Sequence, residues 1–90
     1  MGTRSIDALW ARIKANEGQT FRQIRGKEFS YMVIGSSVIP STTKQNIPRS
    51  HFAEAVTLMP LRDTVPLQHL RGPSYLFAIL MDQRIRAGNW

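Results

Sequence analysis

The stretch TFRQIRGKEFSYMVIG, residues 20–35, decides the fold class that the sequence predicts. Over residues 28–34, aromatic and β-branched side chains dominate and every second position suits a buried face, which is typical of a strand. The run Arg25-Gly26-Lys27 just before it is a natural hairpin turn. A first strand at about 20–24 is therefore expected to pair with the second.

Towards the C-terminus the hairpin leads into a third short strand. Gly35-Ser36-Ser37 forms a turn, and Val38-Ile39 provides the strand. Pro40 has no backbone N–H to donate, so this strand is expected to lie at an edge of the sheet or to end there.

Towards the N-terminus, one apolar stripe predicts a helix over about 5–16. Its members recur at the spacing of one helix face: Ile6, Leu9, Trp10 and Ile13. Ser5 is expected to cap the start of the helix, and Gly18 supplies the left-handed residue that helix ends often need.

A second stripe of the same spacing predicts a helix over about 51–59, with Ser50 as its N-cap. Its members are Phe52, Ala55, Val56 and Met59. Residues 60–72 read as a proline-containing connector with a helical turn around 67–70. The last element, about 74–85, contains the run YLFAILM, which is apolar on all sides. Periodicity does not separate a buried helix from a buried strand here, but leucine, alanine and methionine favour helix.

The expected order is thus helix, three strands, helix, helix, in one domain spanning 1–90. Three antiparallel strands with helices packed on one face form a two-layer α+β domain. The first five elements, over 5–59, are similar in element order to double-stranded-RNA-binding domains and to small toxins built on the same plan. The KKxAK-type helix start of those RNA-binding domains is absent at 50–53.

Charge gives the main indication of function. Twelve lysines and arginines face six acidic residues, for a net charge of +6. Residues 1–50 carry eight basic and three acidic side chains, whereas residues 51–90 carry four and three. Such a balance favours polyanions, nucleic acid before anionic membrane. No membrane partner is expected, because the longest apolar run is far shorter than the ~20 residues of a bilayer span. No signal-peptide core precedes the first helix, so a cytoplasmic location is expected.

The sequence gives little indication of a catalytic or metal centre. The chain has no cysteine, which excludes disulfides and thiolate metal sites, and its histidines match no metal-ligand spacing. No glycine-rich phosphate loop occurs, so neither a metal nor another cofactor is expected. His69 has no partner nearby in the sequence. His51, near Lys44 and Arg49, leaves a small nuclease as an alternative, although the sequence favours a non-enzymatic role.

The residues expected to contact nucleic acid lie on the first hairpin and in the loop over 41–50. That loop offers hydroxyls and cations without any acidic residue from 29 to 53, and long loops are often functional. The predicted contacts go mainly to the phosphate backbone, with DNA and RNA both possible. The candidates are Arg22, Arg25, Lys27, Thr42, Thr43, Lys44 and Arg49.

A protein-interaction or assembly module, such as an accessory protein of a mobile or phage-like element, is the alternative. A helix apolar all round in so small a chain is either the centre of the core or the contact surface for a second copy or another protein. The candidates for such an interface are Phe77, Met81 and Trp90.

Overall fold

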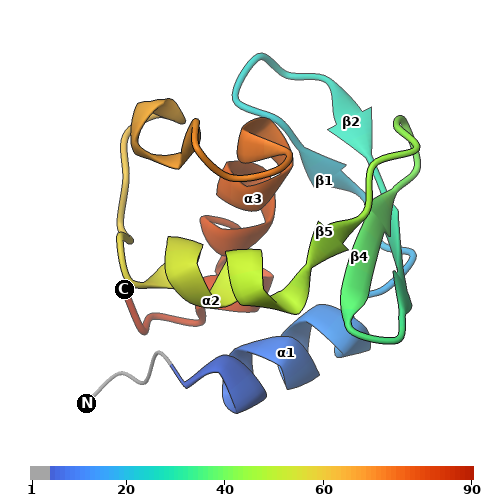
Figure 1. Ribbon diagram of the computed structural model, residues 1–90, viewed down its shortest axis with the longest axis horizontal. Helices are drawn as coiled ribbons and strands as arrows, with labels where there is room; N and C mark the ends of the chain where they lie inside the picture. The colour runs from blue at the N-terminus through green and yellow to red at the C-terminus, as the bar shows by residue number, and fades with distance from the viewer. Residues whose placement is uncertain (1–4) are drawn as a thin grey trace.

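The computed structural model describes residues 5–90 and confirms the α+β class and the predicted order of elements. In chain order the elements are α1 (Ile6–Ala15), β1 (Phe21–Arg22), β2 (Glu28–Phe29), β3 (Tyr31–Ile34), β4 (Ser37–Pro40), β5 (Ile47–Pro48), α2 (Arg49–Val56), the 3₁₀ turn η1 (Val65–Leu67), α3 (Pro73–Leu80) and α4 (Gln83–Arg86). Three strands form an antiparallel sheet in the order β3-β4-β5, and β1 pairs with β2 as a separate hairpin. In Figure 1, α3 occupies the middle of the molecule and the helices lie to one side of the three-stranded sheet.

The two faces of the three-stranded sheet differ in burial. Tyr31 and Val38 point inward and are 1% and 0% exposed, whereas Met32 and Ile34 on the other face are 59% and 56% exposed. Because successive residues of a strand point to opposite faces, this contrast means that the core lies on one side of the sheet. The predicted packing of helices on a single face is therefore what the structure has.

The chain passes from the hairpin to the sheet at Ser30, so the continuous strand predicted over 28–34 is wrong. Phe29 pairs with β1, whereas Tyr31 pairs with β4. The backbone N–H of Ser30 donates to the hydroxyl of Ser41 at 3.0 Å, and the Ser41 N–H donates to the Ser30 carbonyl at 2.8 Å. Both aromatic side chains are still buried, so the alternation persists and only the partner strand changes.

The strand predicted at 38–39 is the middle strand of the sheet, and it spans 37–40. Its second neighbour, β5, was not predicted to be a strand; it pairs with Ser37 and Val38. Ile47 of β5 is fully buried, and the extended backbone expected before Pro48 lets it join the sheet. Pro40 ends the strand as predicted and lies beyond the residues that pair with β5.

Helix α1 lies within the predicted range, and its buried side chains belong to the predicted stripe: Leu9, Trp10 and Ile13. Gly18 follows the helix with φ +85° and donates its N–H to the carbonyl of Tyr31 at 3.0 Å. The Tyr31 hydroxyl donates to the Ile13 carbonyl at 2.5 Å, and burial raises the pKa of this phenol. The end of α1 is therefore bonded directly to β3.

Helix α2 begins at Arg49, two residues before the predicted start, so Ser50 is not its N-cap. Pro48 occupies that position in an extended conformation, and Ser50 is the second helical residue. The N–H of Arg49 donates to the carbonyl of Ser36 in the β3–β4 turn at 2.7 Å. The turn thus satisfies the first free N–H at the start of α2.

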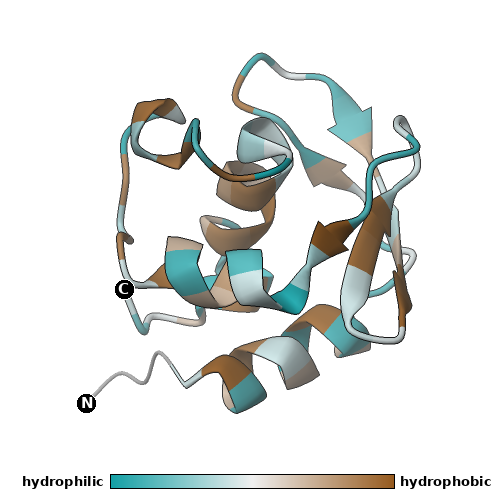
Figure 2. Cartoon of the chain, in the orientation of Figure 1, coloured by the Kyte–Doolittle hydropathy of each residue, from teal (hydrophilic) through white to brown (hydrophobic). Residues whose placement is uncertain are grey.

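The last predicted helix, 74–85, is helical but interrupted. Asp82 separates α3 from α4 and caps α4, because its Oδ1 accepts the backbone N–H of Arg84 at 2.9 Å. Leu76, Ile79 and Leu80 of α3 are fully buried. Figure 2 shows α3 as a largely hydrophobic helix in the interior. The apolar run is therefore the central core helix, one of the two roles expected for it.

The connector over 60–72 brings β5 against the start of α3. Its helical turn is η1, which begins two residues before the predicted start and overlaps the predicted range only at Leu67. Gly72 has φ +62°, and a Cβ added there would lie 2.8 Å from Cδ1 of Ile47. Only glycine fits both the left-handed backbone and this close approach.

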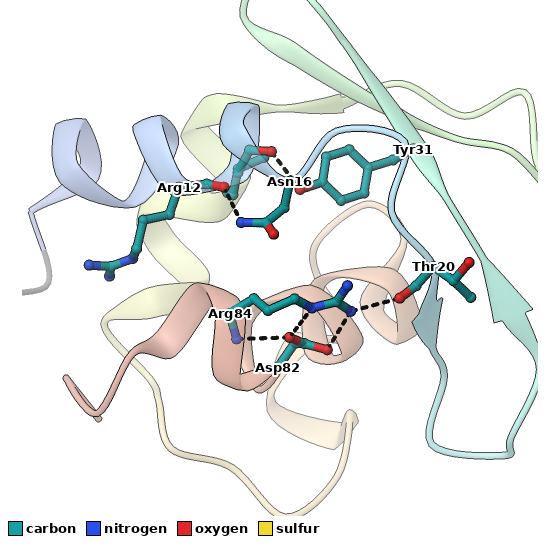
Figure 3. Close-up of polar contacts among 7 residues, drawn as sticks. Arg12, Asn16, Thr20, Tyr31, Asp82 and Arg84 are labelled. Carbon is teal, nitrogen blue, oxygen red and sulfur yellow. Dashed lines mark hydrogen bonds and ion pairs between the residues drawn. The ribbon is translucent and has the colours of Figure 1, made fainter.

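Arg84 joins α4 to the first strand of the hairpin (Figure 3). Its Nη2 donates to the Thr20 carbonyl at 2.7 Å, and its Nε donates to Oδ1 of Asp82 at 2.8 Å. Its guanidinium carbon also lies 4.0 Å from the centroid of the Phe21 ring. The side-chain hydrogen bond from Arg84 is the main reason why the pKa of Asp82 lies below its ordinary value. This cation therefore has a structural role.

Candidate nucleic-acid interface

All six acidic side chains of the protein have a partner in the structure. Three form ion pairs with arginine: Asp7 with Arg49, Glu28 with Arg22, and Asp82 with Arg84. Of the other three, Glu54 contacts His69. Glu17 accepts the backbone N–H of Val33 at 2.6 Å, and Asp63 accepts that of Val65 at 3.0 Å. The negative charge is thus held at defined contacts, and several cations are left without a carboxylate.

Three of the predicted candidates are exposed cations of this kind. Arg25, Lys27 and Lys44 are exposed, and none of their side chains makes a hydrogen bond or ion pair within residues 5–90. Arg25 and Lys27 flank Gly26, whose φ of +90° allows the tight β1–β2 turn. Lys44 lies in the middle of loop 41–46.

Loop 41–46 is held at both ends, with Lys44 between the anchored points. At its start, the hydroxyls of Thr42 and Tyr75 lie 2.7 Å apart. At its end, Nη1 of Arg71 donates to the Asn46 carbonyl at 3.2 Å. Inside the loop, Oγ1 of Thr43 accepts the backbone N–H of Gln45, so Thr43 stabilises the loop itself. The polar stretch therefore adopts a defined conformation over the start of α3.

Tyr75 connects the loop to the hairpin. Its ring lies edge-on to that of Phe29 at a centroid distance of 4.9 Å, and its hydroxyl contacts Thr42. A second contact holds the turn to the same helix, because Nε2 of Gln23 donates to the hydroxyl of Ser74 at 3.3 Å. The β1–β2 turn and loop 41–46 thus both lie against the first turn of α3. From the sequence, Tyr75 was considered only as part of the apolar run 75–81, although its hydroxyl is the one side-chain oxygen in that run.

Arg71 lies with these segments and was not among the sequence-predicted candidates. It is exposed. Within the described residues its guanidinium makes one hydrogen bond, to the Asn46 carbonyl. In the sequence Arg71 is a single arginine before Gly72 and Pro73, and this pattern does not indicate which segments lie beside it in the fold.

Arg22 and Arg49 differ from the free cations. Arg22 pairs with Glu28 across the hairpin at 3.3 Å. Arg49 pairs with Asp7 of α1, and its guanidinium carbon lies 5.7 Å from the ring centroid of Trp10. In Figure 1, α1 and the β1–β2 turn lie on opposite sides of the molecule. Arg49 therefore contributes to the contact between α1 and α2.

The two histidines have partners on the surface near α2. Nδ1 of His51 accepts the backbone N–H of Arg71 at 3.1 Å. Nε2 of His69 contacts the carboxylate of Glu54, so His69 does have a partner, although none is near it in the sequence. The partner was missed because Glu54 is close only in the folded chain. Within residues 5–90, no three histidine or acidic side chains are placed to hold a metal ion.

The residues expected at a protein interface are partly buried against the core. Phe77, Met81 and Trp90 all pack on the core cluster. The indole N–H of Trp90 donates to the Leu80 carbonyl at 2.8 Å, and Arg12 lies 5.8 Å from its ring centroid. These three side chains are therefore partly covered by the protein's own core.

No protein-family model, no curated protein and no solved structure matches the chain. Among residues 5–90, none of the helices combines the length and the hydropathy needed to cross a membrane. Evidence on function therefore comes from the charge distribution and from the segments that meet at the start of α3.

Proposed function

We propose that the protein is a small basic nucleic-acid-binding module that contacts the phosphate backbone through the β1–β2 turn and loop 41–46. The observation that supports this most is the contrast in charge pairing. Arg25, Lys27 and Lys44 are exposed and unpaired within the described residues, whereas every acidic side chain has a partner. Unneutralised cations on one part of a surface attract polyanions and release counterions on contact.

Arg71 extends this group of cations to a third segment. Its Nη1 is used by Asn46, and its other guanidinium N–H groups remain for a phosphate oxygen. The contacts of Gln23 and Tyr75 hold the hairpin and loop 41–46 to the start of α3, and the contact of Arg71 with Asn46 joins the third segment, so the cations are presented on a fixed frame. Backbone contacts of this type carry no sequence information, and both DNA and RNA offer them.

The test measures fluorescence anisotropy of labelled duplex DNA and RNA over a salt series. Binding should weaken steeply with salt, with a logarithmic slope of about −0.9 per phosphate contact. Lys44→Gln should make that slope shallower by about one unit. Lys14→Gln is the matched control, because Lys14 is an exposed lysine of α1, away from the turn in Figure 1.

Two outcomes would count against the proposal. Absence of binding to either nucleic acid at low salt would remove the function itself. Equal effects of Lys44→Gln and Lys14→Gln would show that net charge acts without a defined surface.

A further inference from the structure

A cavity of about 300 Å³ lies beside the β1–β2 turn. Its lining comes from the turn, from the connector before η1 and from the first turn of α3: Gln23, Ile24, Arg25, Thr64 and Ser74. Cavities that hold small ligands typically measure ~300–1,000 Å³, so this one has room for a single small group.

The lining offers both donors and acceptors. Nε2 of Gln23 donates to the hydroxyl of Ser74 at 3.3 Å, which leaves the Gln23 carbonyl oxygen as an acceptor and the Ser74 O–H as a donor. Oγ1 of Thr64 accepts from Gln68 at 3.2 Å, and its own O–H remains able to donate. Ile24 adds apolar surface. A phosphate only accepts hydrogen bonds, whereas a nucleobase has an edge of donors and acceptors and apolar faces.

We propose that this cavity receives one unpaired nucleobase, and that the protein therefore prefers single-stranded nucleic acid. The inference rests on the proposed function, because Arg25 both lines the cavity and belongs to the unpaired cations of the turn. A base in the cavity places its own phosphate beside Arg25. In a duplex the bases are stacked and paired, and flipping one outward costs a few kcal/mol. A duplex thus keeps the phosphate contacts and loses the contact with the base.

The test compares three probes of one length by anisotropy: a single strand, the same sequence as a duplex, and an abasic strand that keeps the sugar-phosphate backbone without bases. The single strand should bind about tenfold more tightly than the abasic strand, which is the discrimination expected from a few good base contacts. Equal binding of these two strands would overturn the inference. If that equal binding still falls with salt, the phosphate-binding function stands and only the base site fails.

Substitutions in the cavity lining test whether the preference for a strand with bases arises in this cavity. Ser74→Leu should obstruct the cavity and lower the ratio of single-strand to abasic affinity to about one, whatever the loss of the Gln23–Ser74 contact does to both affinities. Ser50→Leu is the matched control, because Ser50 is the second residue of α2 as Ser74 is of α3. An unchanged ratio of single-strand to abasic affinity in folded Ser74→Leu protein would contradict the proposed site.

Thr64→Val provides the second variant if thermal unfolding shows that Ser74→Leu does not fold. It removes one hydroxyl and keeps the volume, so single-strand affinity should fall by about threefold to tenfold, the range expected for one hydrogen bond. No change in that affinity would also overturn the inference.

Discussion

The two ends of the β1–β2 hairpin use their cations in opposite ways. At the open end, Arg84 donates to the Thr20 carbonyl and to Asp82, and lies over the ring of Phe21. At the turn, Arg25 and Lys27 are exposed and have no partner within residues 5–90. The formal charge of each residue is the same. Contacts, and not residue type, therefore separate a cation that stabilises the fold from one that is free for a ligand.

The same distinction divides the candidates that the sequence grouped together. Arg49 resembles Arg84, because it pairs with a carboxylate and lies over an aromatic ring. Lys44 resembles Lys27, because it is exposed on an anchored segment without a partner.

The largest effect is expected from Arg84→Met. It removes three side-chain hydrogen bonds and a cation-π contact and keeps the aliphatic part of the chain. Because the side chain is 38% exposed, we expect a loss of about 2 kcal/mol in the free energy of unfolding, measured by urea denaturation. Arg25→Met, the matched substitution at the turn, should change this free energy by less than about 0.5 kcal/mol. Equal losses in the two variants would show that the two ends do not differ as described.

A smaller effect is expected from Tyr75→Phe. This variant keeps the ring against Phe29 and removes the hydroxyl that contacts Thr42. The free energy of unfolding should fall by about 1 kcal/mol, and amide hydrogen exchange in loop 41–46 should accelerate. A double-mutant cycle with Thr42→Val measures the contact directly. Additive effects of the two substitutions would mean that the hydroxyls do not hold the loop.

The smallest effect concerns pH. The pKa of Asp82 is lower in the folded protein, chiefly through the side-chain hydrogen bond from Arg84, so folding favours the charged carboxylate. Its contribution to stability is complete above the unfolded pKa of about 3.9 and is lost as pH falls through the lower folded value. The stability gap between wild type and Asp82→Asn, under about 1 kcal/mol, should shrink below about pH 4. In an Arg84→Met background only the capping N–H of residue 84 still lowers this pKa, so the pH dependence should become smaller, and its persistence at full size would assign it to another group.

Features set by neighbouring residues were predictable from the sequence. The spacing of apolar residues located α1 and the buried side of α2, and Arg25-Gly26-Lys27 located the hairpin turn. The pairing of β5 with β4 was not predictable, because a two-residue strand has no periodicity of its own. The change of partner strand at Ser30 depends on Ser41, and the start of α2 depends on the β3–β4 turn. Both are decided by tertiary contacts.

The candidate interface was predictable in part for the same reason. Charge and loop length indicated Arg25, Lys27 and Lys44, because those properties are visible in the sequence. The pairing of Arg49 with Asp7 joins residues far apart in the chain, so it could not be foreseen. The two contacts of Tyr75, which join the hairpin to the loop, also required the folded structure.

The positions of the two tryptophans have a consequence for spectroscopy. Trp10 packs against Phe52 at a centroid distance of 5.7 Å, and Trp90 donates to the Leu80 carbonyl, so both indoles are fixed by the fold. Neither lies in the β1–β2 turn, in loop 41–46 or in the lining of the cavity. Their intrinsic emission should therefore report unfolding and stay constant when a ligand binds at the start of α3. Fluorescence melts with and without nucleic acid can thus be compared without correction for a local change in the signal.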